Sequence, residues 1–336
     1  MNPKISVIVP TYNAEDYLIN AVNSVINQTF GFENIELILV DDNSNDGTKD
    51  IIKELSEMYE NINVIFLEEN SGSPSKPRNI GIKKAKSEYI MFLDNDDTYC
   101  PDFCQKMYET IEQYGSDFIT CRNYDNVNGK VSRFHSILNK KGKFIQLHSI
   151  EADDTLLSTT SMLIWNKIYR KSLLLDNDIE FPTGTLYEDV YFNLKAYLKA
   201  QNIVFLNDYY GYNYNIRTGG ENKSTSQDFK EENLIKFYNG LNNIFNLLKY
   251  ENKYFKNFEC EMLIGFTKWL LLTKCDIELK LSFLRDFKIH YKKYSLFIRL
   301  EHIPLIQNLL INIGIKFISL NDNFFKLLDF LINIFT

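Results

Sequence analysis

The chain has 336 residues, of which 45% are hydrophobic and 24% are charged, as expected of a folded protein with a sizeable core. Its formal net charge of -7 argues against a general nucleic-acid binder, because phosphate backbones are bound by basic surfaces. The five cysteines have no zinc-like spacing, and we find neither a signal peptide nor an apolar stretch of about 20 residues. We therefore expect a cytoplasmic protein with no membrane-spanning helix.

Short apolar runs alternate with segments of helical periodicity over the first part of the chain. Strands are predicted at 5–9, 35–40, 63–67 and 89–93, and a polar loop follows each of them. Such alternation favours parallel strands with right-handed crossovers, whose carboxyl ends lie at one edge of the sheet. We therefore predict an α/β fold, with a Rossmann-like, mostly parallel central sheet flanked by helices and a nucleotide pocket at that edge.

The predicted strand at 89–93 ends in Asp94, Asn95, Asp96 and Asp97. Carboxylates crowded at the end of a buried strand repel one another unless a cation lies among them. Mg²⁺ and Mn²⁺ prefer such oxygen ligands and usually share them with the phosphates of a substrate. The alternative interpretation is a polar turn that caps the next helix.

The loops after the other predicted strands carry further candidate binding residues. They are Pro10, Tyr12, Asp41, Asp42, Asn70 and Arg78. The guanidinium of Arg78 suits phosphate oxygens or an acidic cluster, although a lone arginine on a helix is often only exposed. For Asp41 and Asp42, the alternative is a turn followed by a helix cap.

In the second half of the chain, Glu188 and Asp189 begin a predicted helix. Its buried stripe is predicted to consist of Leu186, Val190, Leu194 and Leu198. Acidic residues are favoured at helix N-termini by the macrodipole, so a structural role is the alternative to a catalytic one. Two short strands are predicted next, at 203–206 and 209–214.

From residue 226 onward the sequence is helical in period and carries no recognisable chemical motif. The apolar segment 303–320 is interrupted by polar residues, which indicates a packed or interfacial helix. A helical cap on the catalytic domain and a dimer surface are alternatives. The region is thus compatible with peripheral contact at the inner face of the cell membrane and with a homo-oligomer.

In their joint order and spacing, the loop motifs resemble those of the family 2 inverting glycosyltransferases of the GT-A fold. The matching segments are, in chain order, Ile5–Asn13, Val40–Thr48, Asn70–Gly81 and Phe92–Asp97. A second block, Trp165–Arg170 with Glu188 and Asp189, resembles the acceptor half of bacterial surface-polysaccharide members. The resemblance implies a GT-A catalytic domain followed by a C-terminal helical region, with the bounds 1–225 (a nucleotide-sugar half, 1–122, and an acceptor half, 123–225) and 226–336.

The resemblance also implies how the loops bind a nucleotide-diphosphate sugar. Pro10 and Tyr12 would flank the base, and Asp41, or else Asp42, would accept a hydrogen bond from it. A carboxylate suits the imide N–H of uracil, which favours UDP as the nucleotide. The implied donor site is completed by Asn70, Arg78, Asp94 and Asn95.

Catalytic roles are implied for two groups of acids. Asp96, together with Asp94, would hold Mn²⁺ or Mg²⁺, which neutralises charge on the departing diphosphate. Asp189 would deprotonate the acceptor hydroxyl, with Glu188 supporting it or contacting the acceptor. Asp97 would only cap the next helix.

The predicted function is metal-dependent, inverting transfer of a sugar from a nucleotide-diphosphate sugar to a hydroxyl of a bacterial surface glycan. The acceptor would be a glycan or a lipid-linked glycan, as in capsule, lipooligosaccharide or teichoic acid. One alternative is a non-catalytic relative that binds nucleotide-sugars or glycans. A sugar nucleotidyltransferase is another, although no glycine-rich phosphate-binding loop follows the first predicted strand.

Overall fold

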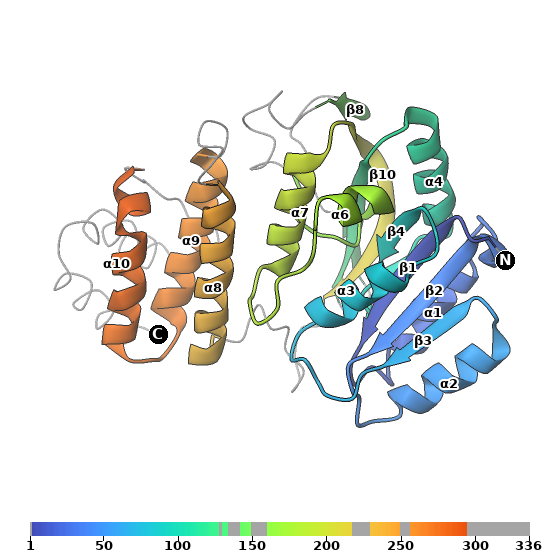
Figure 1. Cartoon of the computed structure of the whole chain (residues 1–336), viewed down its shortest axis with the longest axis horizontal. Helices are drawn as coiled ribbons and strands as arrows, with labels where there is room; N and C mark the ends of the chain where they lie inside the picture. The colour runs from blue at the N-terminus through green and yellow to red at the C-terminus, as the bar shows by residue number, and fades with distance from the viewer. Residues whose placement is uncertain are drawn as a thin grey trace. The chain divides into compact units, whose positions relative to one another are not determined.

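The computed structural model describes residues 2–127, 130–133, 142–148, 160–216, 229–248 and 256–293. The chain divides into two compact units (Figure 1). The described residues of Met1–Gly184 and Glu188–Glu221 form the first unit, and those of Thr185–Tyr187 and Asn222–Thr336 form the second.

The first unit is an α/β structure built on one sheet. Its strands are β1 (Ile5–Thr11), β2 (Ile35–Asp41), β3 (Ile62–Phe66), β4 (Tyr89–Phe92), β5 (Thr98–Tyr99), β6 (Phe118–Val127), β7 (Lys130–Arg133), β8 (Phe144–Leu147), β9 (Lys167–Arg170) and β10 (Ile203–Ile216). Its helices are α1 (Leu18–Ile26), a 3-10 turn (Phe32–Asn34), α2 (Thr48–Met58), α3 (Ser75–Lys84), α4 (Phe103–Tyr114), α6 (Lys171–Asp176) and α7 (Glu188–Lys199).

The strand order is β3-β2-β1-β4-β9-β6-β10-β5, with β7 added beside β6 and β8 beside β10. The four strands predicted in the first part of the chain are parallel, as expected: β1 pairs with β2 and β4, and β2 pairs with β3. Strand β9 is antiparallel to both β4 and β6. The whole sheet is therefore mixed, and its parallel part carries the loops that the sequence analysis singled out.

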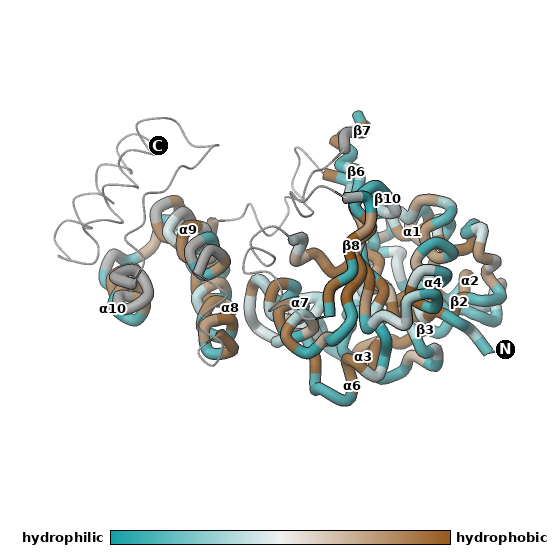
Figure 2. Tube along the Cα trace, turned by 90° about the horizontal axis from the view of Figure 1, so that it is seen from above, coloured by the Kyte–Doolittle hydropathy of each residue, from teal (hydrophilic) through white to brown (hydrophobic). Residues whose placement is uncertain are grey.

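Helices cover both faces of the central strands, which explains why these strands are apolar throughout rather than alternating. Every residue of β1, β2 and β4 is buried. On β4, Phe92 contacts Phe192 of α7, whereas the ring of Tyr89 meets Tyr108 of α4. Because these two strand residues point to opposite faces, α7 and α4 lie on opposite sides of the sheet. Figure 2 shows the hydrophobic residues running along the strands between the helices.

Two details of the predicted elements are wrong. The strands predicted at 203–206 and 209–214 are one strand, β10, whose pairing with β6 shifts register between Leu206 and Tyr212. A bulge of this kind places polar residues inside the strand and interrupts its apolar pattern. The stripe predicted for α7 is also wrong, because only Leu194 of it is buried, and the helix instead packs through aromatic rings such as Phe192 and Tyr197.

The second unit is helical in its described part, with helices α8 (Glu231–Leu248), α9 (Lys256–Leu272) and α10 (Ile277–Lys293). Phe237 of α8 stacks on Tyr187 and meets Trp269 of α9 edge to face. The segment 303–320 lies outside the described residues. Among the helices that the structure does describe, none is both long and apolar enough to span a bilayer.

Candidate active site

The acidic turn after β4 is held in place by the end of β10. Buried Asp97 accepts hydrogen bonds from the Tyr212 hydroxyl (2.7 Å) and from the backbone N–H of Asn215 (2.7 Å). Burial raises its pKa well above the ordinary value, and the negative charges of Asp94 and Asp96 raise it further. The next helix, α4, begins only at Phe103, so the prediction that Asp97 caps it is wrong. Asp97 instead fixes the turn to the sheet.

The other residues of the turn are tied to the strand ends on either side. The Asn95 side chain donates to the carbonyl of Pro10 at the end of β1 (3.2 Å). The Asn215 side chain donates to the backbone carbonyl of Asp96 (2.8 Å), while the backbone N–H of Asp94 donates to the Tyr212 hydroxyl (3.3 Å). These bonds hold the backbone of the acidic turn against the ends of β1 and β10.

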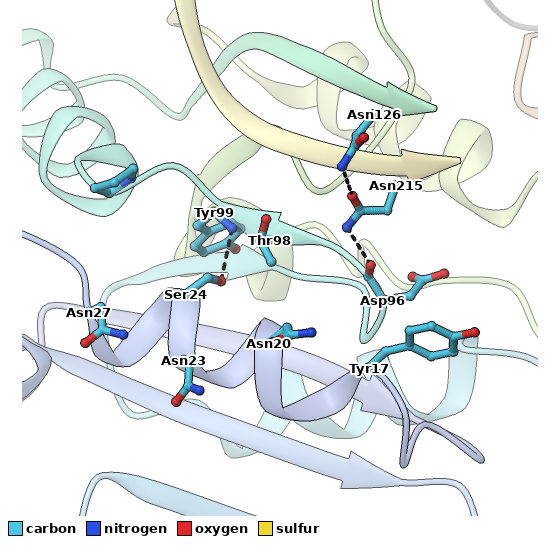
Figure 3. Close-up of a pocket in the computed structure, with 11 residues that line it drawn as sticks. Tyr17, Asn20, Asn23, Ser24, Asn27, Asp96, Thr98, Tyr99, Asn126 and Asn215 are labelled. Carbon is cyan, nitrogen blue, oxygen red and sulfur yellow. Dashed lines mark hydrogen bonds between the residues drawn. The ribbon is translucent and has the colours of Figure 1, made fainter. Parts of the chain in front are cut away.

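Beside Asp96, a pocket of about 660 Å³ opens between α1 and the ends of the neighbouring strands (Figure 3). Much of its lining is carboxamide: Asn20, Asn23, Asn27, Asn126 and Asn215. Carboxamides both donate and accept hydrogen bonds, so such a lining suits hydroxyl groups.

Arg78 brings acids from two distant segments together. Its guanidinium lies 2.7 Å from an oxygen of Asp94, 3.0 Å from one of Asp189 and 3.6 Å from one of Glu188. Only 4% of this side chain is exposed, and it lies over the ring of Phe181 at 5.4 Å. Burial alone would lower the pKa of Arg78, but the three carboxylates raise it above its ordinary value. The arginine is therefore a shared, permanent counter-charge.

The same environment changes the acidity of the two acids that begin α7. Burial is the largest influence on Asp189 and raises its pKa; Arg78 opposes this effect, and the net result is a pKa of about 7. Burial likewise raises the pKa of Glu188. A quarter of the Asp189 side chain remains exposed, so a ligand can reach it. A carboxylate with a pKa near neutrality is suited to exchanging a proton with a substrate.

The two acids at the carboxyl end of β2, Asp41 and Asp42, form hydrogen bonds within the protein itself. Buried Asp41 accepts hydrogen bonds from the hydroxyl and the amide of Ser44 (2.5 and 3.0 Å). Asp42 accepts from the amide and the hydroxyl of Ser71, and its carbonyl accepts from the Asn70 side chain. These bonds shape the loops after β2 and β3, and the base-binding role of these residues stays a prediction. Tyr12, in contrast, is 47% exposed.

The structure therefore brings Arg78, Asp94, Glu188 and Asp189 together, although 111 positions separate Arg78 from Asp189. It also adds residues that the sequence analysis missed, namely Tyr212, Asn215 and Lys167. Lys167 is the first residue of β9 and lies within the block Trp165–Arg170, whose resemblance to the acceptor half of the family was an available signal. Tyr212 and Asn215 lie in a strand with many polar and aromatic residues and offered none. Trp165 is 2% exposed and stacks on Tyr212 at 4.1 Å, so it belongs to the core.

No group of three or more His, Cys, Asp or Glu side chains is arranged to hold a metal ion within the part of the chain that the structure describes. Asp94 and Asp96, the two acids predicted to bind a metal ion, both lie in the acidic turn, and the carboxylate of Asp94 is paired with Arg78. Mg²⁺ is typically bound by one or two carboxylates, with substrate phosphates and water completing its coordination.

Residues 6–174 match the family described as "Glycosyl transferase family 2", and the chain belongs to this family. It is 36% identical over 248 residues to the poly(ribitol-phosphate) beta-glucosyltransferase of Bacillus spizizenii, an alignment that covers 73% of this chain and 37% of that protein. It is also 36% identical over 233 residues to the poly(ribitol-phosphate) beta-N-acetylglucosaminyltransferase TarS of Staphylococcus aureus, covering 68% of this chain and 39% of TarS. The alignments thus span less than half of either relative.

Solved structures show the same fold. Segment 1–349 of S. aureus TarS in complex with UDP-GlcNAc has a TM-score of 0.67 and 24% identity, over 99% of this chain and 92% of that one. The UDP complex of the same segment has a TM-score of 0.55 and 26% identity, over 98% of this chain and 86% of that one. The first unit is thus a GT-A domain, as the motifs predicted.

Proposed function

We propose that this protein transfers a sugar from a UDP-sugar to a hydroxyl of a bacterial surface glycan, with inversion at the anomeric carbon. The observation that carries the proposal is the Arg78 cluster, which places Asp189 close to the acidic turn at the carboxyl end of β4. Family membership and the two 36% identical relatives support this reaction class. The UDP complex of a relative supports UDP as the nucleotide.

Asp189 is the proposed general base. A single displacement at the anomeric carbon requires one group to take the proton from the attacking hydroxyl. Its pKa of about 7 leaves much of Asp189 ionised at neutral pH, while its affinity for a proton is far above that of an ordinary aspartate. Glu188, which shares the Arg78 counter-charge, supports the base or contacts the acceptor.

Asp96 and Asp94 are the proposed ligands of Mn²⁺ or Mg²⁺. The acidic turn suits a cation, because three carboxyl groups lie close together there: burial first, and then the charges of Asp94 and Asp96, raise the pKa of Asp97. When bound, the metal would neutralise negative charge on the diphosphate leaving group. The nucleoside would lie over the loops of Pro10, Tyr12, Asp41, Asp42, Asn70 and Asn95, where Tyr12 offers an exposed ring for stacking.

The acceptor is proposed to be a hydroxyl-bearing polymer of the cell surface. The two relatives are named for transfer of glucose or N-acetylglucosamine to poly(ribitol-phosphate). UDP-glucose and UDP-N-acetylglucosamine are therefore the first donors to test, with a ribitol-phosphate oligomer as the acceptor. The amide-lined pocket beside Asp96 is a candidate surface for further hydroxyl groups of the polymer.

A donor screen tests the proposal. The full chain is mixed with UDP- and GDP-sugars and candidate acceptors, with Mn²⁺ or Mg²⁺, and release of the nucleoside diphosphate is measured. We expect acceptor-dependent release of UDP. Binding of a UDP-sugar without release under any condition would instead identify a non-catalytic binding protein.

The metal site is tested separately by calorimetry of UDP binding. We expect Mn²⁺ to increase the affinity of the wild type for UDP, and Asp96→Ala to remove this dependence. Asp50→Ala is the matched control, because Asp50 is an exposed acid on α2. Equal affinity of the wild type with and without Mn²⁺ would contradict the metal site.

A further inference from the structure

Lys167 of β9 is fully buried, with 0% of its surface exposed. Its ammonium group donates to the carbonyl of Ser161 (2.9 Å), to the side-chain oxygen of Asn166 (2.9 Å) and to the carbonyl of Leu163. An ammonium ion has three N–H donors and no acceptor, so these three oxygens match it fully. The neutral amine would instead turn its lone pair toward one of them.

The segment Ser161–Asn166 surrounds this ammonium group. It contacts α7, which carries Asp189, and Tyr212 of β10, which binds the acidic turn. On one side, the carbonyl of Met162 accepts a hydrogen bond from the Asn193 side chain (2.7 Å), which also donates to the carbonyl of Asp189 (3.0 Å). On the other side, Trp165 stacks on Tyr212, whose hydroxyl holds the acidic turn.

Asn193 is itself fixed, because its side-chain oxygen accepts a hydrogen bond from the Tyr169 hydroxyl (2.7 Å). Both Tyr169 and Lys167 belong to β9, which lies between β4 and β6 in the sheet. The contacts from Tyr169 and from Met162 thus meet at the carboxamide of Asn193, which connects them to the carbonyl of Asp189 in the first turn of α7.

We infer that Lys167 is a positioning residue for the transfer reaction: its buried ammonium group holds the segment Ser161–Asn166, and this segment sets the position of Asp189 through Asn193. The inference rests on the proposed function of Asp189. Nothing in the reaction requires Lys167 to touch the substrate, and its complete burial excludes such contact.

The electrostatic effect of Lys167 follows from the groups around Asp189. They are Arg78 of α3, Asp94 of the acidic turn, Glu188 of α7, and Lys167 and Tyr169 of β9. Lys167 is one of two cations in this set, and it lowers the pKa of Asp189. Burial lowers the pKa of Lys167 itself to about 7, so the lysine is mostly charged below pH 7.

The test is the pH dependence of sugar transfer by Lys167→Met, which keeps an unbranched side chain, shorter by one atom, and removes the charge. We expect kcat at pH 7 to fall by about 10- to 100-fold, because small displacements of catalytic groups have effects of this size. We also expect the acid limb of the kcat/KM profile to move to higher pH, since Asp189 loses a neighbouring positive charge.

Lys171→Met is the matched control, because the Lys171 ammonium also donates to a backbone carbonyl, that of Ala85 (3.1 Å), but away from Asp189. We expect the pH profile of this variant to be unchanged. A purely structural role for Lys167 would lower the rate equally at all pH values, so an unshifted acid limb in Lys167→Met contradicts the inference. Failure of the wild type to transfer sugar would contradict the proposed function instead.

Loss of a buried lysine can prevent folding, so a second variant tests the same connection. Asn193→Leu keeps Lys167 and cuts the contact between Met162 and α7. We expect kcat to fall by about 10-fold or more, with the donor KM changed by less than about threefold. An unchanged kcat in a folded Asn193→Leu protein would contradict the positioning role.

Discussion

At the scale of single residues, the site depends on one buried guanidinium shared by three carboxylates. Arg78 cannot lose its proton, and its planar fork reaches Asp94 and Asp189 through different nitrogens. Its charge opposes the effect of burial on Asp189, which would otherwise hold that group in its protonated form. Arg78 therefore contributes to both the position and the acidity of the proposed base.

The raised pKa of Asp189 predicts the pH dependence of the reaction. Because a general base must be ionised, the rate should fall as the pH decreases through about 7. Asp189→Asn should lower kcat by about 10²- to 10⁴-fold and leave donor binding nearly intact. UDP release measured from pH 5 to 9, with calorimetry of UDP binding, checks both expectations.

The matched control for Asp189→Asn is Glu180→Gln, which removes an exposed acid paired with Lys83. This variant should retain the wild-type rate and pH profile. Full activity in Asp189→Asn would show that another group takes the proton.

At the scale of elements, the position of Arg78 is set by the close approach of α3 to the sheet. A β-carbon added at Gly81 would lie 2.5 Å from a methyl carbon of Ile8 on β1. Carbon atoms of different residues do not approach one another this closely, so a side chain at Gly81 must push α3 away from β1. The glycine thus has a packing role, one turn along the helix from the arginine.

Gly81→Ala should consequently reduce both stability and activity. We expect a loss of about 1–3 kcal/mol in the free energy of unfolding, as for other overpacked cores. Displacement of Arg78 should also lower kcat. Urea denaturation and UDP release measure the two effects. Gly47→Ala is the control, because the atoms nearest to its added carbon belong to the flexible Glu15 side chain. Equal stability of Gly81→Ala and the wild type would contradict this account.

At the scale of the whole molecule, the raised pKa of Asp189 makes the stability of the fold depend on pH. The folded-state pKa of Asp189 is about 7, whereas an aspartate in an unfolded chain has a pKa of about 3.9. The stability contributed by this group is therefore fully present below about pH 4 and is lost as the pH rises through about 7. Active sites commonly retain such costs because the function requires them.

This linkage predicts that Asp189→Asn is more stable than the wild type in alkaline solution. Asparagine cannot ionise, so the variant does not lose stability as the pH rises through about 7. Relative to the wild type, its melting temperature should rise between pH 5 and pH 8 by something of the order of 5 °C. Thermal unfolding without donor at the two pH values measures this difference. An identical difference at both pH values would contradict a raised pKa.

Much of the catalytic domain could be predicted because its signals are local. Continuous apolar runs followed by polar loops identified β1, β2, β3 and β4, and the shared edge of parallel strands predicted that their loops meet. The bulged β10 and the buried face of α7 were missed, since both depend on which neighbour a residue packs against. The buried stripe predicted for α7 is wrong because the helix packs Phe192 against the rings of Phe92 and Phe181, which come from distant segments of the chain.

The order of the loop motifs along the chain was sufficient to determine the family and the α/β fold, because each motif is a contiguous run of residues. The tertiary structure alone decided that Arg78 joins Asp94 to Asp189, that Asp97 binds Tyr212, and that the buried Lys167 binds the carbonyl of Ser161. Acidity and burial depend on groups far apart in sequence, and only folding brings those groups within a few ångströms of one another.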